Sequence, residues 1–208
     1  GASTPPRRIL VWTTTPWTLP GNVGLAVGAK IEYVKVKAED GTYILAKERL
    51  ATVFGDKPYE VLGTMKGSEL AGGSYKPLYT FAEALASDAE KPKFENAFKV
   101  YAADFVTTED GTGIVHTAVM YGQEDFELGT KVGLPKVHLV ASDGTFIKGT
   151  GFLEGRFVKE TDENGKPTLA VDILDDLRAR GLFFSQENHL HSYPFCWRCK
   201  TRLIYYAR

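Results

Sequence analysis

The chain has 208 residues, 43% of them hydrophobic and 25% charged, which is typical of a globular protein with a sizeable core. No run of about 18 apolar residues is present, so no membrane-spanning helix is expected, and the first residues lack the apolar core of a signal peptide. The net charge of −1 argues against extended nucleic-acid binding but allows a pocket for the end of one strand. We therefore expect a cytoplasmic protein without membrane contact.

The first third of the chain predicts short strands separated by turns. Runs of β-branched and aromatic residues predict strands at 7–15, 25–27, 33–38 and 42–45. Pro16 must end the first strand because it has no N–H to donate, and residues 18–22 are rich in turn formers. Residues 46–54 predict a helix that Gly55 closes.

The rest of the chain mixes strands with helices. Residues 60–64 predict a strand, 67–73 a loop, and 80–95 a mobile loop with some helix. The pair Asp110-Gly111 between strands at 98–107 and 113–119 indicates a hairpin. Helices are expected at 123–131, ending near Gly133, and at 171–180, ending at Gly181. Further strands are expected at 137–140, 183–192 and 203–207.

This order of elements predicts a mainly β fold with peripheral helices, of a β-barrel-like kind. Strands that begin or end abruptly at both ends suit a domain inserted into a larger protein. We expect residues 1–208 to form that single domain, with the junctions near 1–8 and 192–208.

The two cysteines, Cys196 and Cys199, form one CxxC pair. Such a pair is half of a metal site, a redox pair or a purely structural feature, and a structural zinc needs four ligands. The nearest histidines, His189 and His191, fit no zinc-finger spacing. The favoured interpretation is half of a zinc site whose other half is missing.

Three consecutive threonines, Thr13, Thr14 and Thr15, end the first predicted strand. In a strand, Thr13 and Thr15 would share one face and Thr14 would take the other. Threonine favours strands, so the simplest interpretation is a β-branched strand end. Because Pro16 stops the ladder there, the hydroxyls are also available to a pocket.

A second constellation runs from Gly111 to Phe126 and contains His116 and Asp125. A single histidine inside a strand is more often a core residue than a catalyst. Asp125 lies near the start of a predicted helix, where a carboxylate is favoured by the helix dipole, and Glu124 is an equal candidate by composition.

Several enzyme classes lack their motifs in this sequence. There is no Gly-x-Ser-x-Gly elbow, no Walker A sequence and no His-Glu-x-x-His. Neither cysteine lies in a nucleophile motif with histidine. The remaining possibility is a non-covalent site of hydroxyls, one imidazole and one carboxylate, with water as the nucleophile.

Three motifs, in order, resemble the inserted editing domain of class I isoleucyl-tRNA synthetases. They are WTTTPWTLPGN at 12–22, GTGIVHTA with GQEDF at 111–126, and HSYPFCWRCKT at 191–201. The valyl and leucyl enzymes carry an arginine in place of the third threonine and an acidic residue in place of Trp17. The resemblance implies the β-barrel-like editing fold of the isoleucyl, valyl and leucyl enzymes, and hydrolysis of the ester of mischarged Val-tRNA(Ile), with valyl-adenylate as a further substrate.

The resemblance also implies residue roles. Asp125 would bind the α-ammonium of the substrate, and His116 would set the size of the side-chain pocket or orient the substrate without serving as an essential general base. Thr13, Thr14 and Thr15 would bind the ester and terminal ribose and place the water. Thr18 and Asn22 would also bind substrate, Asn22 as a support for the threonine loop, whereas Trp17 is expected to pack. Met120 and Tyr121, where bacterial members often show a Pro-Gly-His type run, are expected to shape the pocket mouth.

The expected partners are the aminoacylated 3′ end of tRNA(Ile) and the rest of the parent synthetase, with the chain itself a monomer. Editing needs no cofactor, although the parent uses ATP and Mg. Zinc at Cys196 and Cys199 would need a missing upstream CxxC, so we predict none bound here. Two alternatives to editing stay open: a catalytically silent module that binds the acylated RNA end, and a purely structural insertion.

Overall fold

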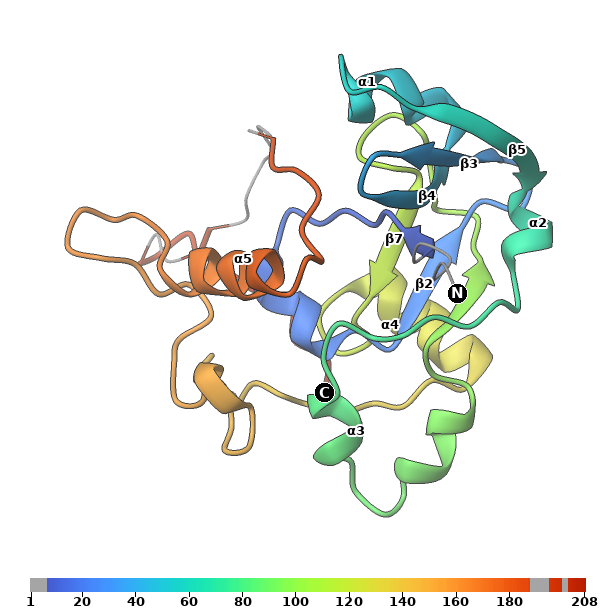
Figure 1. The fold of residues 1–208 in the computed structure, drawn as a ribbon. Helices are drawn as coiled ribbons and strands as arrows, with labels where there is room; N and C mark the ends of the chain where they lie inside the picture. Colours follow the sequence, from blue (N-terminus) through green and yellow to red (C-terminus); the bar gives the residue numbers. More distant parts are fainter. Residues whose placement is uncertain (1–6, 188–194, 200–201) are drawn as a thin grey trace, which may run out of the picture. The chain divides into compact units, whose positions relative to one another are not determined.

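The computed structural model describes residues 7–187, 195–199 and 202–208 of the chain, which form two compact units. The strand unit comprises Gly1–Thr13, Gly24–Lys76 and Phe98–Thr117, and it contains every strand of the described residues. The loop unit comprises Thr14–Val23, Pro77–Ala97 and Ala118–Arg208. Figure 1 labels the main elements of both units.

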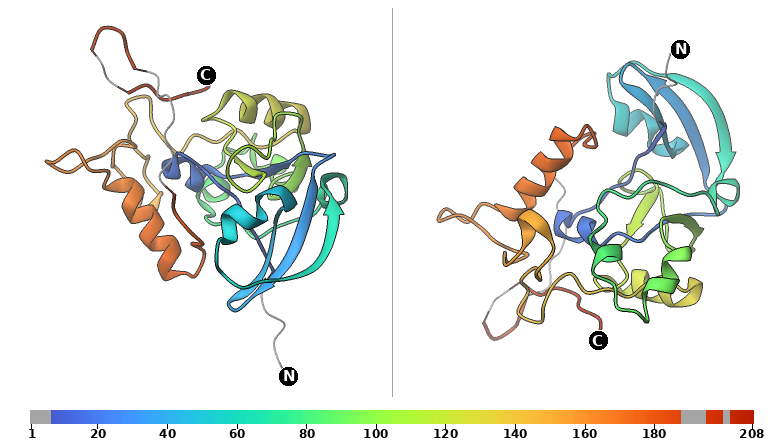
Figure 2. Two further views of the ribbon diagram at one scale, coloured as in Figure 1. Left: turned by 90° about the horizontal axis from the view of Figure 1, so that it is seen from above. Right: turned by 60° about the horizontal axis from the view of Figure 1, so that its bottom comes forward.

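One sheet of the strand unit is formed, among the described residues, by four strands in the order β1-β4-β3-β5. Their bounds are β1 Arg7–Ile9, β3 Glu32–Ala38, β4 Gly41–Ala46 and β5 Glu60–Lys66. β3 pairs antiparallel with β4 and β5, whereas β1 runs parallel to β4. In Figure 2 these strands stay side by side from both directions. The predicted strands at 33–38, 42–45 and 60–64 are confirmed.

The second sheet contradicts the hairpin predicted at Asp110-Gly111. In the described chain its order is β6-β2-β7, with β2 Gly24–Val27, β6 Lys99–Ala102 and β7 Ile114–Thr117. β2 lies between the other two strands, parallel to β6 and antiparallel to β7. Gly111 lies instead in the segment that connects β6 to β7, with a φ of 63°. A Cβ atom at this residue would lie 2.2 Å from the ring of Trp12. The Asp110-Gly111 pair therefore does not form a two-residue hairpin turn. Gly111 is instead a site where the backbone lies close to the Trp12 ring.

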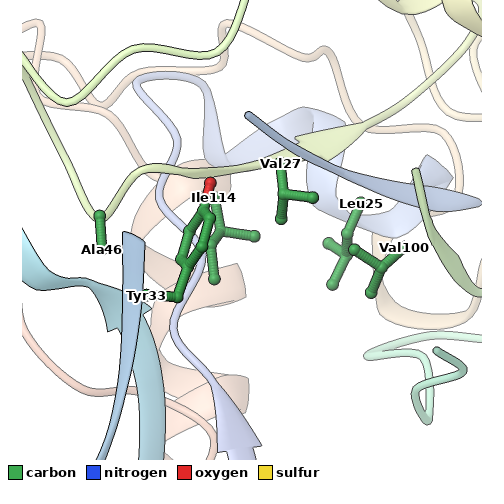
Figure 3. Packing of buried hydrophobic residues seen from close by; sticks show 6 residues of the cluster. All are labelled: Leu25, Val27, Tyr33, Ala46, Val100 and Ile114. Carbon is green, nitrogen blue, oxygen red and sulfur yellow. The ribbon is translucent and has the colours of Figure 1, made fainter. Parts of the chain in front are cut away.

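The two sheets share one hydrophobic core, drawn in Figure 3. Leu25, Val27, Val100 and Ile114 come from the second sheet, and Tyr33 and Ala46 come from the first. The Tyr33 hydroxyl donates a hydrogen bond of 2.7 Å to the Gly113 carbonyl and accepts one of 3.0 Å from the Gly28 N–H. Both hydrogen bonds of the buried Tyr33 hydroxyl are therefore made within the core. The side chain joins the two sheets and leaves no buried polar atom of its own without a partner.

Short helices complete the strand unit. The 3-10 helix η2 (Lys47–Arg49) leads into α1 (Leu50–Phe54), which ends at Gly55 with φ 53°, as predicted for residues 46–54. Residues 67–73, predicted as a loop, begin with a helical turn, α2 (Gly67–Leu70). The Glu69 carboxylate accepts a hydrogen bond of 2.6 Å from the Lys66 N–H. This N–H lies at the start of the helix, where backbone donors have no partner within the helix.

The loop unit has helices separated by irregular segments: η1 Pro16–Gly21, α3 Phe81–Ala84, η3 Lys91–Glu95, α4 Gln123–Val132, η4 Gly151–Leu153 and α5 Leu169–Ala179. α5 buries Leu169, Ile173 and Leu177, a spacing of four that places them on one face of the helix, and it contacts η1. Both predicted long helices are confirmed, and Gly133 ends α4 in the left-handed conformation.

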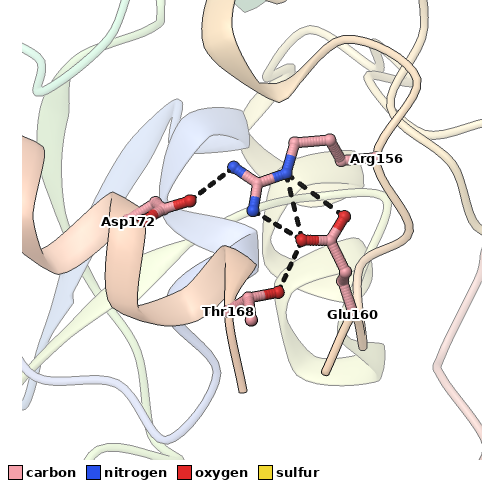
Figure 4. Close-up of polar contacts among 4 residues, drawn as sticks. All are labelled: Arg156, Glu160, Thr168 and Asp172. Carbon is pink, nitrogen blue, oxygen red and sulfur yellow. Dashed lines mark hydrogen bonds and ion pairs between the residues drawn. The ribbon is translucent and has the colours of Figure 1, made fainter. Parts of the chain in front are cut away.

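An ion-pair network holds the start of α5 (Figure 4). Arg156 binds Glu160 through two nitrogens, at 2.6 Å for the shortest contact, and Asp172 of α5 at 2.7 Å. Thr168, which precedes α5, donates to Glu160 at 2.5 Å. The segment 156–160 is thereby attached to the first turn of the helix.

The other expectations have mixed outcomes. Sheets with few helices are confirmed, although no closed barrel occurs in the described parts of the chain. The predicted strand at 7–15 is wrong beyond Ile9, with only an isolated bridge at Trp12. Of the strand predicted at 183–192, residues 183–187 form none and 188–192 lie outside the described residues, and the strand predicted at 203–207 is absent. The strand predicted at 137–140 is also absent, and the segment forms only an isolated β-bridge between Val140 and Phe146. Within the described residues no helix is long and apolar enough to span a membrane.

Candidate functional site

Asp125 lies in the first turn of α4, directly after a loop formed by residues 118–122. Its Oδ2 atom accepts a hydrogen bond of 3.1 Å from the N–H of Ala118, so the carboxylate turns back from the helix onto the start of this loop. Glu124, the alternative by composition, is exposed. The structure therefore distinguishes two neighbouring acids that the sequence could not.

Partial burial raises the pKa of Asp125 to about 6, although the hydrogen bond from Ala118 acts in the opposite direction. The nearby charge of Glu124 adds to the rise. A carboxylate held in such a place is poorly solvated when ionised, and a cationic group beside it would favour its charged form. This is the electrostatic setting of a binding residue for an ammonium group.

Gly122 leaves the room for this carboxylate. A Cβ atom at residue 122 would lie 2.8 Å from Asp125 Oδ2, closer than such contacts occur in proteins. The backbone of Gly122 is extended, at φ −155°, so no left-handed conformation demands a glycine. No sequence pattern marks this role of Gly122, because only the folded loop brings residue 122 against the carboxylate.

The threonine-rich segment is a turn that enters a 3-10 helix and is not a strand end. Thr15 caps η1, and Thr18 donates its N–H and its hydroxyl to the Thr15 carbonyl at 3.0 and 2.8 Å. The two hydroxyl oxygens lie 3.2 Å apart. The alternation of faces for Thr13, Thr14 and Thr15 depended on a strand that reaches Thr15, and that strand ends at Ile9. Thr14 is exposed, and Thr13 and Thr15 are half-buried.

Two further residues of this segment are buried. Asn22 ends η1, its backbone N–H donating to the Leu19 carbonyl at 3.1 Å. Trp17 is 5% exposed and packs edge-on against Tyr121, with ring centroids 5.2 Å apart. The expectation that Trp17 is a packing residue is confirmed. Tyr121 is itself buried, and its effect on a pocket mouth stays a prediction.

The contact between the rings of Trp17 and Tyr121 joins two segments of the loop unit. One segment carries Thr15 and Thr18, and the other leads to Asp125. Thr13 and His116 belong to the strand unit. His116 lies in β7 opposite Leu25 of β2, and it is buried. Burial lowers its pKa to about 4, so the imidazole is neutral near pH 7 and is a weak base. That state suits a packing or orienting residue better than a general base.

The CxxC pair lies near the C-terminal end of the described chain, with Cys196 half-buried and Cys199 exposed. His189 and His191 lie outside the described residues. No cluster of three or more possible metal ligands occurs in the part of the chain that the structure describes.

Comparison with known proteins gives close sequence relatives. The chain is 44% identical over 198 residues to the isoleucine–tRNA ligase of Bacillus thuringiensis (strain Al Hakam), a match that covers 95% of this chain and 17% of that protein. It is 45% identical over 207 residues to the isoleucine–tRNA ligase of Bdellovibrio bacteriovorus, covering 98% of this chain and 18% of that protein. The chain therefore spans about a sixth of the length of the relatives it matches. No protein-family model matches it.

Among solved structures, one crystal structure of the P. falciparum cytosolic leucyl-tRNA synthetase editing domain, with deletions of insertions 1 and 3, is similar at a TM-score of 0.49. The sequence identity is 13%, and the match covers 62% of this chain and 47% of that one.

The sequence relatives place the chain among the tRNA ligases. Within that class it aligns, over nearly its whole length, with one segment of the isoleucine–tRNA ligases. The family resemblance inferred from the three motifs is thereby confirmed.

Proposed function

We propose that this chain is an editing module that hydrolyses the aminoacyl ester of mischarged Val-tRNA(Ile). The observation that carries the proposal is the Asp125 carboxylate, held by the Ala118 N–H in a partly buried loop where burial raises its pKa to about 6. An aminoacyl ester presents an α-ammonium, which an ordinary RNA end lacks. A charge-assisted hydrogen bond between that ammonium and Asp125 would select the acylated end.

The need for such a module follows from the limits of a single binding pocket. One missing methylene is worth only about 1–3 kcal/mol of discrimination, a value for which the isoleucyl enzyme is itself the standard example. A second site that admits valine would exclude isoleucine by a similar amount, about 1–3 kcal/mol, if it is rigid. Passing both sites separates the two amino acids better than either alone.

The hydroxyls of Thr13, Thr14, Thr15 and Thr18 would bind the ester and ribose and place the attacking water. Water attacks the ester carbonyl, the bond to the ribose oxygen breaks, and valine leaves as the free acid. Asn22 would hold the threonine turn, and neutral His116 would orient the substrate. We propose that the reaction needs no metal or other cofactor, and that valyl-adenylate is a second substrate.

The proposal also defines partners. A net charge of −1 gives little attraction for a tRNA body, so the rest of the ligase would deliver the acylated 3′ end. The parent would use ATP and Mg to attach isoleucine elsewhere in the molecule. We propose a monomeric, cytoplasmic enzyme.

The decisive experiment measures hydrolysis of Val-tRNA(Ile) by wild type, Asp125→Ala and Gly122→Ala. The full-length ligase should carry the same substitutions in parallel. Asp125→Ala should lower kcat/KM by about tenfold to hundredfold, the value of a charge-assisted contact. Unchanged hydrolysis in this variant would remove the role of Asp125.

The Gly122→Ala variant tests the position of the Asp125 carboxylate without removing the carboxylate itself. The added methyl group meets the end of a flexible side chain, so it should displace Asp125 and lower kcat/KM while the free energy of unfolding changes little. Gly63→Ala is the matched control, because a Cβ atom at that glycine meets nothing within 4 Å. Equal activity of the two glycine variants would contradict the placement of the carboxylate.

Two other functions remain as outcomes of this experiment. A silent module would bind a non-hydrolysable valyl-adenosine analogue and never hydrolyse the ester. A purely structural insertion would bind neither compound.

A further inference from the structure

Tyr121 is a buried residue of the loop before α4 to which the proposed chemistry assigns no role. Its hydroxyl oxygen accepts the N–H groups of Leu139 at 2.7 Å and Val140 at 3.0 Å. Its own N–H donates to the Ala118 carbonyl at 2.9 Å. Because two backbone donors converge on one phenol oxygen, both ends of this side chain are held in place.

The face and edge of the ring meet the threonine-rich segment. Trp17 contacts the ring at a centroid distance of 5.2 Å and an interplanar angle of 63°. At the other end of η1, a Cβ atom at Gly21 would lie 3.3 Å from the Tyr121 ring. The Tyr121 ring therefore lies beside η1 near both of its ends, at Trp17 and at Gly21.

These contacts relate two sets of site residues. η1 is capped by Thr15 and contains Thr18, whose hydroxyls lie 3.2 Å apart. The loop of Tyr121 begins at Ala118, which donates to the Asp125 carboxylate. Tyr121 therefore contacts both the segment that carries the threonine turn and the loop that holds the Asp125 carboxylate.

A third segment is anchored beside the same ring. The Tyr206 hydroxyl donates to the Val140 carbonyl at 3.1 Å, and the Ala207 N–H donates to the Met120 carbonyl at 3.0 Å. His138 stacks on Tyr206 with centroids 4.3 Å apart. The C-terminal segment thus contacts the residue before Tyr121 and also Val140, whose N–H donates to the Tyr121 hydroxyl.

We propose that Tyr121 is a positioning residue for ester hydrolysis, which holds the Thr15–Thr18 turn and the Asp125 loop in one fixed arrangement. This inference rests on the proposed function for its catalytic consequence. The mechanical part, a common dependence of the two segments on one side chain, stands on the contacts alone.

Three variants test the inference. Tyr121→Phe keeps the ring and removes the acceptor of the two amides, Tyr121→Leu removes the ring, and Gly21→Ala presses on the ring from η1. Tyr79→Phe is the matched control, since Tyr79 is also 9% exposed, lies in the same unit and donates its hydroxyl to Asp176 at 2.8 Å.

Amide hydrogen exchange of the 208-residue chain gives a readout independent of activity. In Tyr121→Phe the amides of Leu139 and Val140 should exchange about tenfold faster or more, because their acceptor is gone. The inference requires that the Thr18 and Ala118 amides also exchange faster in the Tyr121 variants and Gly21→Ala, while the Tyr79→Phe control leaves them unchanged. Acceleration confined to Leu139 and Val140 would show a merely local role and overturn the inference.

Kinetics of Val-tRNA(Ile) hydrolysis supply the second readout. Misplaced reacting groups should lower kcat by about tenfold or more in Tyr121→Leu, with a smaller change in KM. Wild-type kcat in that variant would overturn the inference even if exchange responds. If the wild-type chain and its parent ligase hydrolyse nothing, the proposed function fails, and the exchange data still decide whether Tyr121 holds the two segments.

Discussion

Asp125 and His116 are ionisable side chains that burial drives toward their neutral forms. For Asp125 the pKa rises from 3.8 to about 6, and for His116 it falls from 6.5 to about 4. The Asp125 carboxyl is neutral at low pH, whereas the His116 imidazole is neutral at high pH. The two residues should therefore change stability with pH in opposite directions.

For Asp125 the folded state binds protons more tightly than the unfolded state. The stability that this confers is present below pH 3.8 and is lost as the pH rises through about 6, by at most about 3 kcal/mol. Relative to Asp125→Asn, wild type should lose stability between pH 4 and 7, as measured by urea unfolding at each pH. A difference that is independent of pH would show that the carboxylate is well solvated.

For His116 the folded state disfavours the charged form. The corresponding stability is present above pH 6.5 and is lost as the pH falls through about 4, on the order of 3 kcal/mol. Wild type should lose stability relative to His116→Gln over this range. The same variant should keep the pH dependence of ester hydrolysis between pH 6 and 8, and an inflection that it abolishes would instead make His116 a general base.

At the scale of elements, α5 depends on the network that precedes it. Arg156 uses a planar fork toward Glu160, and its hydrogen bonds to Glu160 and Asp172 raise its pKa further. Lysine cannot reproduce that geometry. These side chains are 24–50% exposed, so screening reduces what the network contributes.

We expect Arg156→Lys to lower the free energy of unfolding by about 1–2 kcal/mol, measured with urea. Lys91→Gln is the control, because its partner Asp88 is 98% exposed and such a pair contributes about 0–1 kcal/mol. Equal effects of the two substitutions would mean that the network does not stabilise α5.

At the scale of the whole molecule, the chain passes between its two compact units five times, after residues 13, 23, 76, 97 and 117. Neither unit is a continuous piece of sequence. Residues 118–208 alone would lack η1, whose Trp17 and Leu19 are each 5% exposed in the folded chain. The prediction that residues 1–208 form one domain agrees with this connectivity but stays a prediction.

A fragment of residues 118–208 should therefore show no cooperative thermal transition, whereas the full chain should show one. Circular dichroism during heating makes the comparison. A cooperative transition in the fragment would show that its core does not need residues 14–23 and 77–97.

Local patterns were enough to predict several elements. The helix α4 ends at Gly133, Gly181 follows the C-cap residue of α5, and α5 carries leucine and isoleucine at a spacing of four. Strands β3 and β4 follow from β-branched residues around Asp40-Gly41. These features depend on neighbours within one or two turns of chain, which is why sequence alone determined them, together with the family and its candidate residues.

Long-range packing decided the rest. β2 pairs between β6 and β7, residues more than 70 positions away, so no local signal at Asp110-Gly111 could reveal that the hairpin is absent. Strand β1 ends at Ile9, before the threonines, because its pairing with β4 stops there, and the acidity of Asp125 depends on burial by the fold around it. Burial and pairing are properties of the assembled chain, and they determine which of the candidate side chains are solvated, neutral or held in place.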